Sequence, residues 1–121
     1  MYSLALSILL WLNYKHLVAD WIFQTDDMIK HKGIYGNWRG ALHSLLHAVL
    51  TLFVFWYFVS FKAGAIFFGV DFILHYHIDW LKMKFGCQDI SKKAFWSHIG
   101  YDQFLHYTCY IAYVAFLAKV V

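Results

Sequence analysis

The chain alternates between long apolar stretches and shorter polar segments. Four apolar stretches, at about residues 2–23, 41–61, 63–81 and 99–121, are long enough to cross about 30 Å of hydrocarbon as helices. A tight turn at Lys62 separates the two middle stretches, and the polar segments 24–40 and 82–98 make the other two connections. We therefore predict an all-α membrane protein with four transmembrane helices, built as a single domain over residues 1–121.

The composition also indicates a membrane environment. Hydrophobic residues make up 62% of the chain and charged residues only 14%, which leaves too little polar surface to cover the protein in water. This balance disfavours intrinsic disorder, and it also disfavours nucleic-acid binding, because that needs a basic face. No proline interrupts the long helices. Cys87 and Cys109 lack the spacing of a metal motif, so we expect two unpaired thiols.

The basic residues predict how the helices are oriented. Seven of the ten positive charges lie in the two long polar segments, and the positive-inside rule places such segments in the cytoplasm. Both termini then lie outside, which agrees with an even number of spans. The residues that carry these seven charges are Lys30, Lys32, Arg39, Lys82, Lys84, Lys92 and Lys93.

A pattern of polar residues recurs after 59 positions. Each half contains His-x3-Asp-Trp, and His43 follows His16 by 27 residues just as Asp102 follows His75. We therefore expect two helix hairpins, at about residues 1–61 and 62–121, related by a pseudo-two-fold axis along the membrane normal. The hairpins together would form one bundle.

The repeated residues occur in pairs four positions apart, which places each pair on one helix face, one turn apart. Because the helices alternate in direction, the deeper members form one layer and the members nearer the cytoplasmic segments form a second. The deep layer comprises His16, His47, His75 and His106. The layer nearer the cytoplasm comprises Asp20, His43, Asp79 and Asp102.

These two layers predict a metal site. An ionisable residue in a membrane helix costs about 2.5–3.5 kcal/mol on insertion scales, so it must face the interior and find a partner. Imidazole and carboxylate groups bind divalent zinc, iron or manganese, and helix bundles build such sites from facing helices. We expect all eight residues to be candidate ligands for one or two ions, with zinc favoured. The alternative is a metal-free His–Asp network that only ties the helices together.

Other polar residues flank these positions. Lys15 and Asp71 interrupt apolar helix faces, and an unpaired charge there is costly, so we expect the two side chains to pair. Gln24 and Gln103 adjoin the candidate ligands. Thr25 or Asp26 is expected to cap a short helix in the first polar segment. We expect the remaining histidines to lie at the surface, although one of them is a single turn before Asp102; these are His31, His77 and His98.

The segments HLVADWIFQTDDM, HIDWLK and DQFLH, together with H-x3-H, resemble a family of small integral membrane proteins of unknown function from bacteria and their phages. More distantly, the chain is similar to prophage-associated membrane proteins described as metal-dependent hydrolases. The resemblance covers nearly the whole chain and implies a metal site at the repeated His and Asp positions. It also implies a bacterial inner membrane, or the host membrane for a phage protein. Lys15 departs from the pattern, because an apolar residue is expected there.

Three functions fit these observations. The first is a metal-dependent hydrolase that acts on a phosphoester or lipid at the cytoplasmic face, with Asp102 as general base and Gln103 orienting water or substrate. Arg39, Lys82 and Lys84 would favour an anionic small molecule or lipid as substrate. The second is a haem- or metal-binding redox or transport module, and the third is a structural metal site. The oligomeric state stays open.

Overall fold

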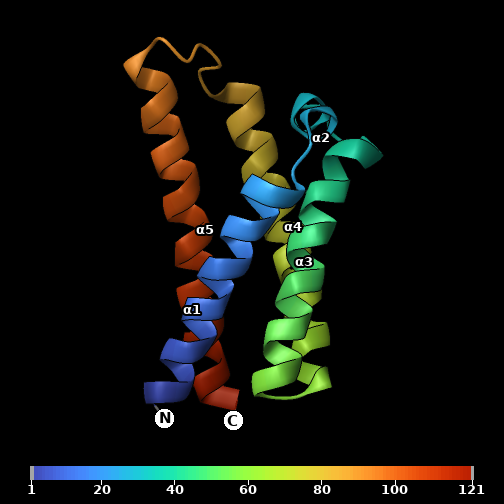
Figure 1. Ribbon diagram of the computed structural model, residues 1–121, viewed down its shortest axis with the longest axis vertical. Coiled ribbons are helices and arrows are strands. Elements are labelled where there is room, and N and C mark those ends of the chain that lie inside the picture. Colours follow the sequence, from blue (N-terminus) through green and yellow to red (C-terminus); the bar gives the residue numbers. More distant parts are fainter. Residues whose placement is uncertain (1, 121) are drawn as a thin grey trace.

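The computed structural model describes residues 2–120, which form an all-helical bundle (Figure 1). The long helices are α1 (Tyr2–Val18), α3 (Trp38–Phe58), α4 (Phe61–Phe85) and α5 (Lys93–Val120). A π-helical segment, η1 (Ala19–Phe23), continues α1, and a short helix, α2 (Asp26–His31), lies in the first connection. Both termini lie at one end of the bundle, and both long connections lie at the other.

The helices begin where side chains cap them. Thr25 caps α2 by accepting a hydrogen bond from the Met28 N–H, as the sequence predicts. Ser60 caps α4 by accepting from the Ala63 N–H at 3.2 Å. The turn between α3 and α4 therefore falls at residues 59–60, and the prediction of a turn at Lys62 is wrong, because the cap places Lys62 in the first turn of α4.

The helices also extend beyond the apolar stretches of the sequence. Helix α4 extends to Phe85 and α5 starts at Lys93, so the second connection is shorter than the predicted segment 82–98. Helix α3 similarly begins at Trp38. Helices extend beyond the apolar stretches because charged side chains such as Lys82 find partners inside the bundle. In the described part of the chain, α3 is the one helix that is long and apolar enough to cross a membrane on those two criteria.

The bundle joins its helices in chain order. Helix α3 packs on α1 and on α4, and α5 packs on α4 and returns to α1. Gly64 allows α3 and α4 to approach closely, since a Cβ there would lie 2.7 Å from the Leu52 carbonyl oxygen. The apolar core fills the end near the termini, where the Phe55 and Phe67 rings stack at 4.1 Å. The other end is left to polar side chains.

Candidate metal centre

The structure brings together the repeated histidines and aspartates. Each of the four long helical stretches contributes one pair of them, four residues apart, to the interior of the bundle. Seven of these residues are buried, and Asp20 keeps a side-chain exposure of 19%. The eight residues are His16, Asp20, His43, His47, His75, Asp79, Asp102 and His106.

The four deep histidines converge as the spacing predicts. The rings of His47 and His75 stack with their centroids 3.7 Å apart, and those of His75 and His106 lie 4.0 Å apart. His16 faces all three, at centroid distances of 4.8, 5.6 and 5.0 Å from His47, His75 and His106. His75 is therefore the centre of this layer.

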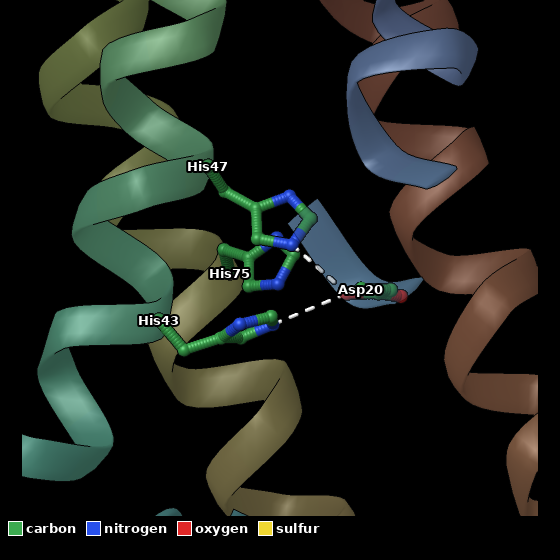
Figure 2. Close-up of side chains that lie close together, drawn as sticks. All are labelled: Asp20, His43, His47 and His75. Atoms are coloured by element: carbon green, nitrogen blue, oxygen red, sulfur yellow. Dashed lines mark hydrogen bonds and ion pairs between the residues drawn. The ribbon is translucent and has the colours of Figure 1, made fainter. Parts of the chain in front are cut away.

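The aspartates lie against these rings. Asp20 Oδ1 is 3.0 Å from His47 Nε2 and 3.2 Å from His43 Nε2, as the dashed lines in Figure 2 indicate. Figure 2 also shows that Asp20, on the α1 side, points across the bundle toward histidines from α3 and α4. Asp79 occupies the matching place in the second half, with Oδ1 3.1 Å from His106 Nε2.

Three sets of ligand atoms are close enough to hold a metal ion. Within each set, the nitrogen and oxygen atoms lie within 4.8 Å of one another. His75 belongs to two sets and His106 to two, so the sets adjoin. They are Asp20 with His43, His47 and His75; His16 with His75 and His106; and Asp79 with Asp102 and His106.

Several of these atoms lack a hydrogen-bond partner within residues 2–120. His43 Nδ1 and His75 Nδ1 are buried and have no partner in this part of the chain, whereas His43 Nε2 and His16 Nε2 lie 3.2 and 3.0 Å from Asp20 oxygens without forming a hydrogen bond. Asp79 Oδ2 and Asp102 Oδ1 likewise accept no hydrogen bond, although they lie 3.0 Å from Lys32 Nζ and 3.4 Å from His106 Nε2. An unsatisfied buried polar atom costs about 1–3 kcal/mol. A divalent cation would use such lone pairs, so this donor set fits a metal.

His47 fits a metal least well of the eight. The Lys15 ammonium lies 3.3 Å from His47 Nδ1 and can only donate there, which puts the ring proton on Nε2. That Nε2–H then donates to Asp20. His47 is therefore satisfied without an ion, whereas the Nδ1 atoms of His43 and His75 have no partner among the described residues.

The predicted pair of Lys15 and Asp71 is confirmed. Lys15 Nζ lies 2.9 Å from Asp71 Oδ2, and the two side chains are 4% and 2% exposed. Thr51 and Tyr113 also donate to the Asp71 carboxylate, at 2.7 and 3.0 Å. The carboxylate neutralises the cation that departs from the apolar pattern, so Lys15 leaves no uncompensated charge beside the histidines.

Sequence reasoning missed two residues at the site. Lys32, expected in a loop, is buried with its Nζ 3.0 Å from Asp79 Oδ2, and no local pattern distinguishes it from its exposed neighbour Lys30. Tyr110 pairs its hydroxyl with His16 Nδ1 at 2.7 Å. Tyr110 could have been predicted from the sequence, because it lies one turn beyond His106 on the helix face that carries Asp102 and His106.

The expected neighbours of the site divide into two groups. Gln103 donates to Asp102 Oδ2 at 3.1 Å, and Lys82 Nζ lies 3.0 Å from the same oxygen. Arg39 instead pairs with Asp27 on the surface, at 3.5 Å, and Lys84 lies over the Trp80 ring. Of the three basic residues expected at the mouth, Lys82 is the one in contact with a candidate ligand.

The remaining histidines also have local partners. His31 Nδ1 lies 2.7 Å from the Asp27 carbonyl oxygen, and His77 Nε2 lies 2.9 Å from the Tyr35 hydroxyl. His98 Nδ1 accepts from the Cys87 N–H at 2.7 Å. None of these three belongs to a described set of metal ligands.

Fold and site together define an all-helical protein whose bundle encloses His and Asp side chains able to hold a metal ion. The chain belongs to the family described as protein of unknown function DUF3307, whose match covers residues 8–121. No curated protein and no solved structure matches the chain.

Proposed function

We propose that this protein is a membrane-embedded metallohydrolase that cleaves a phosphoester, in a lipid or a small anionic molecule, at the cytoplasmic face. The observation that carries the proposal is the three adjoining sets of imidazole nitrogens and carboxylate oxygens, each set within 4.8 Å, in which several buried atoms form no hydrogen bond. One or two divalent ions, zinc before iron or manganese, would be held by these atoms. The resemblance to membrane proteins described as metal-dependent hydrolases points to the same chemistry.

The surface of the molecule supports a membrane location. Large apolar side chains face outward on the long helices, with Leu10 67%, Tyr57 84% and Phe104 65% exposed. Inside, by contrast, charged and polar side chains are buried. Such a distribution suits a hydrocarbon solvent, where polar groups must pair internally. We assign four spans to α1 with η1, α3, α4 and α5, arranged as two hairpins about a pseudo-two-fold axis.

The reaction needs an ion, a base and a way to orient water. A bound divalent ion would lower the pKa of a water molecule toward neutrality, and its charge would stabilise the negative charge that develops in the transition state. Asp102 Oδ1 accepts no hydrogen bond in the described structure, with His106 Nε2 3.4 Å away, and is the atom that we assign to accept the water proton. Gln103 donates to the other oxygen of Asp102, which fixes the direction of Oδ1.

A haem fits this interior poorly. The rings of His47, His75 and His106 stack face to face, at centroid distances of 3.7 and 4.0 Å. Axial haem ligands instead point a nitrogen at one iron from opposite sides of a macrocycle. The carboxylates beside these rings also favour a hard divalent ion over haem.

The test is a metal and activity measurement on the purified protein. We expect elemental analysis to find one or two zinc ions per chain after mild purification. We also expect chelator-sensitive hydrolysis of an aryl phosphate or of phosphatidic acid in nanodiscs. A protein that holds zinc but cleaves neither substrate would favour a structural or transport metal. A visible absorption band typical of haem would overturn the assignment. A protein without metal would favour the metal-free His–Asp network.

Orientation is tested separately by cysteine labelling. Lys30 on α2 and Lys93 at the start of α5 are exposed at the end of the bundle that carries the long connections, so cysteines placed there report which side the connections face. Lys32 is unsuitable because its side chain is 6% exposed. We expect a membrane-impermeant maleimide to label neither position in intact cells and both after lysis. Labelling in intact cells would reverse the orientation.

A further inference from the structure

A small cavity lies between the two long connections, and two of its lining residues contact candidate metal ligands. Its volume is about 230 Å³, and side chains of both connections and of the adjoining ends of α4 and α5 line it, half of them apolar. We call it the vestibule, and its polar lining residues are Gln24, Lys32, Lys82, Gln88 and His98. At this size it suits a polar headgroup rather than a whole lipid or a drug-sized molecule.

Two lysines connect the vestibule to the candidate ligands. Lys32 lines the cavity and pairs with Asp79, and Lys82 lines it and pairs with Asp102, both at 3.0 Å. The two aspartates belong, with His106, to one set of metal ligands. The ammonium groups therefore hold the carboxylates that a metal ion would use.

Metal binding changes what these lysines can do. An ion at Asp79 and Asp102 competes with both ammonium groups for the same oxygens. Metal-ligating histidines are neutral, so the three carboxylates of the centre, the two lysines and one divalent ion leave a net charge of plus one. A buried excess of positive charge is costly, and an anion in the vestibule would offset it.

The vestibule supplies further hydrogen-bonding groups. Because His98 Nδ1 accepts from the Cys87 N–H, the ring proton lies on Nε2, which is a donor. Gln24 Oε1 is buried and has no partner among the described residues, so it can accept from a hydroxyl group. Two cations, an N–H donor and an acceptor match a phosphate attached to a hydroxyl-bearing carbon chain.

We infer that the vestibule binds the phosphate group of the substrate through Lys32 and Lys82, which metal binding releases from Asp79 and Asp102. This inference rests on the proposed function and adds the two residues that bind the phosphate group and the coupling of that binding to the metal. It makes metal and phosphate binding cooperative. Thermodynamic linkage requires the effect to be mutual, so each ligand strengthens the other by the same factor.

The probe is glycerol phosphate, with the full chain in phosphatidylcholine nanodiscs and binding followed by equilibrium dialysis. We expect saturating zinc to raise the affinity for glycerol phosphate about tenfold, as is typical of coupled sites. Glycerol phosphate should raise the zinc affinity equally. Lys82→Met and Lys32→Met should each abolish the gain in affinity. Lys30→Met should keep the gain, because Lys30 is exposed on α2, the short helix that Lys32 directly follows.

Two results would overturn the inference while leaving the metal centre intact. One is zinc bound with no gain in phosphate affinity. The other is a gain that Lys82→Met leaves unchanged, which would mean that phosphate binds the ion directly. Lys82 is partly exposed, so this variant is expected to fold even if Lys32→Met does not. A wild-type sample without zinc would instead contradict the proposed function.

The source of the phosphate is decided in the same system. If a lipid headgroup enters the vestibule, phosphatidic acid added to the nanodiscs will displace glycerol phosphate from the zinc-loaded protein. If the substrate is a soluble phosphate, the added lipid will leave that affinity unchanged. Both results support a phosphate site in the vestibule.

Discussion

The two halves of the chain make the same contacts at the centre of the bundle. His47 lies 3.0 Å from Asp20, and 59 residues later in both partners His106 lies 3.1 Å from Asp79. Each of these aspartates also contacts the histidine one turn before it on its own helical stretch. The shared contacts form the core of the candidate metal centre, and the chemistry that distinguishes the halves lies around it.

The halves differ at His43 and its counterpart Asp102. His43 bridges the halves, with Nε2 3.2 Å from Asp20 and 3.5 Å from Asp79. Asp102 instead faces Lys82. The second half thus has an extra negative charge at the end of the centre nearer the long connections and a cation that offsets it. A departure from the repeat is tolerated inside the bundle when an opposite charge accompanies it.

The largest effect is expected where the two halves meet, at His75. His75 belongs to two of the sets of metal ligands, so His75→Ala removes a ligand from both. We expect zinc affinity to fall by more than the roughly 10–100-fold loss seen when a residue that only orients a ligand is changed. Elemental analysis and competition with a chelator measure it.

His77→Ala is the matched control, since His77 lies two residues away on α4 and contacts Tyr35 outside the centre. Equal zinc content in the two variants would contradict the role of His75. The same measurement on His16→Ala tests whether the first half contributes ligands as the second does.

Sequence patterns predicted most of the centre because helix geometry is local. A spacing of four residues fixes a shared face for His75 and Asp79 on α4 whatever surrounds them. Pairing of Lys15 with Asp71 could also be predicted, because a buried charge demands a partner and the interior offered one.

The rest depends on how connections dock, which no periodicity encodes. Lys32 reaches Asp79 because the first connection packs closely on α3 at Gly40, where a Cβ would lie 2.6 Å from the His31 carbonyl oxygen. That contact brings a residue that resembles any loop lysine into the interior. The position of the turn near Lys62 likewise depended on Ser60, a cap that hydropathy does not reveal.

The difference between His43 and Asp102 is tested by Asp102→Asn. If Asp102 is the general base, this change should lower turnover by about 10²–10⁴-fold, the usual contribution of such a group. Zinc content should stay nearly intact, because the amide keeps a ligand oxygen. Phosphate release and elemental analysis on the same sample separate the two effects. Full turnover in Asp102→Asn would exclude the role of general base.

Lys15 and Asp71 form the second departure from the repeat, since their counterparts are Leu74 and Leu12. Lys15→Leu leaves a buried carboxylate without its cation, and we expect a loss of about 3 kcal/mol in the free energy of unfolding. The Thr51 and Tyr113 hydroxyl groups still donate to Asp71 and keep the loss near that value.

Changing both residues to leucine, as in the counterpart positions, should cost less than Lys15→Leu alone. Denaturation of the four proteins of this double-mutant cycle in detergent micelles measures the coupling. If the changes in unfolding free energy of the two single variants add up to that of the double variant, the ion pair contributes no stability of its own.

The smallest effect is expected in the connections, where only the first half carries a short helix. Thr25 caps α2 through the Met28 N–H, and loss of an N-cap costs about 1 kcal/mol. Thr25→Ala should therefore raise amide exchange across residues 26–32 about fivefold, since 1 kcal/mol corresponds to that factor in an opening equilibrium. Because α2 precedes Lys32 directly, the same variant should also weaken the zinc-dependent gain in phosphate affinity. Thr108→Ala serves as control, because Thr108 bonds only the Phe104 carbonyl oxygen of its own helix in the described structure. Equal exchange in the two variants would mean that the packing of α2 on α3, rather than its cap, holds Lys32 at the site.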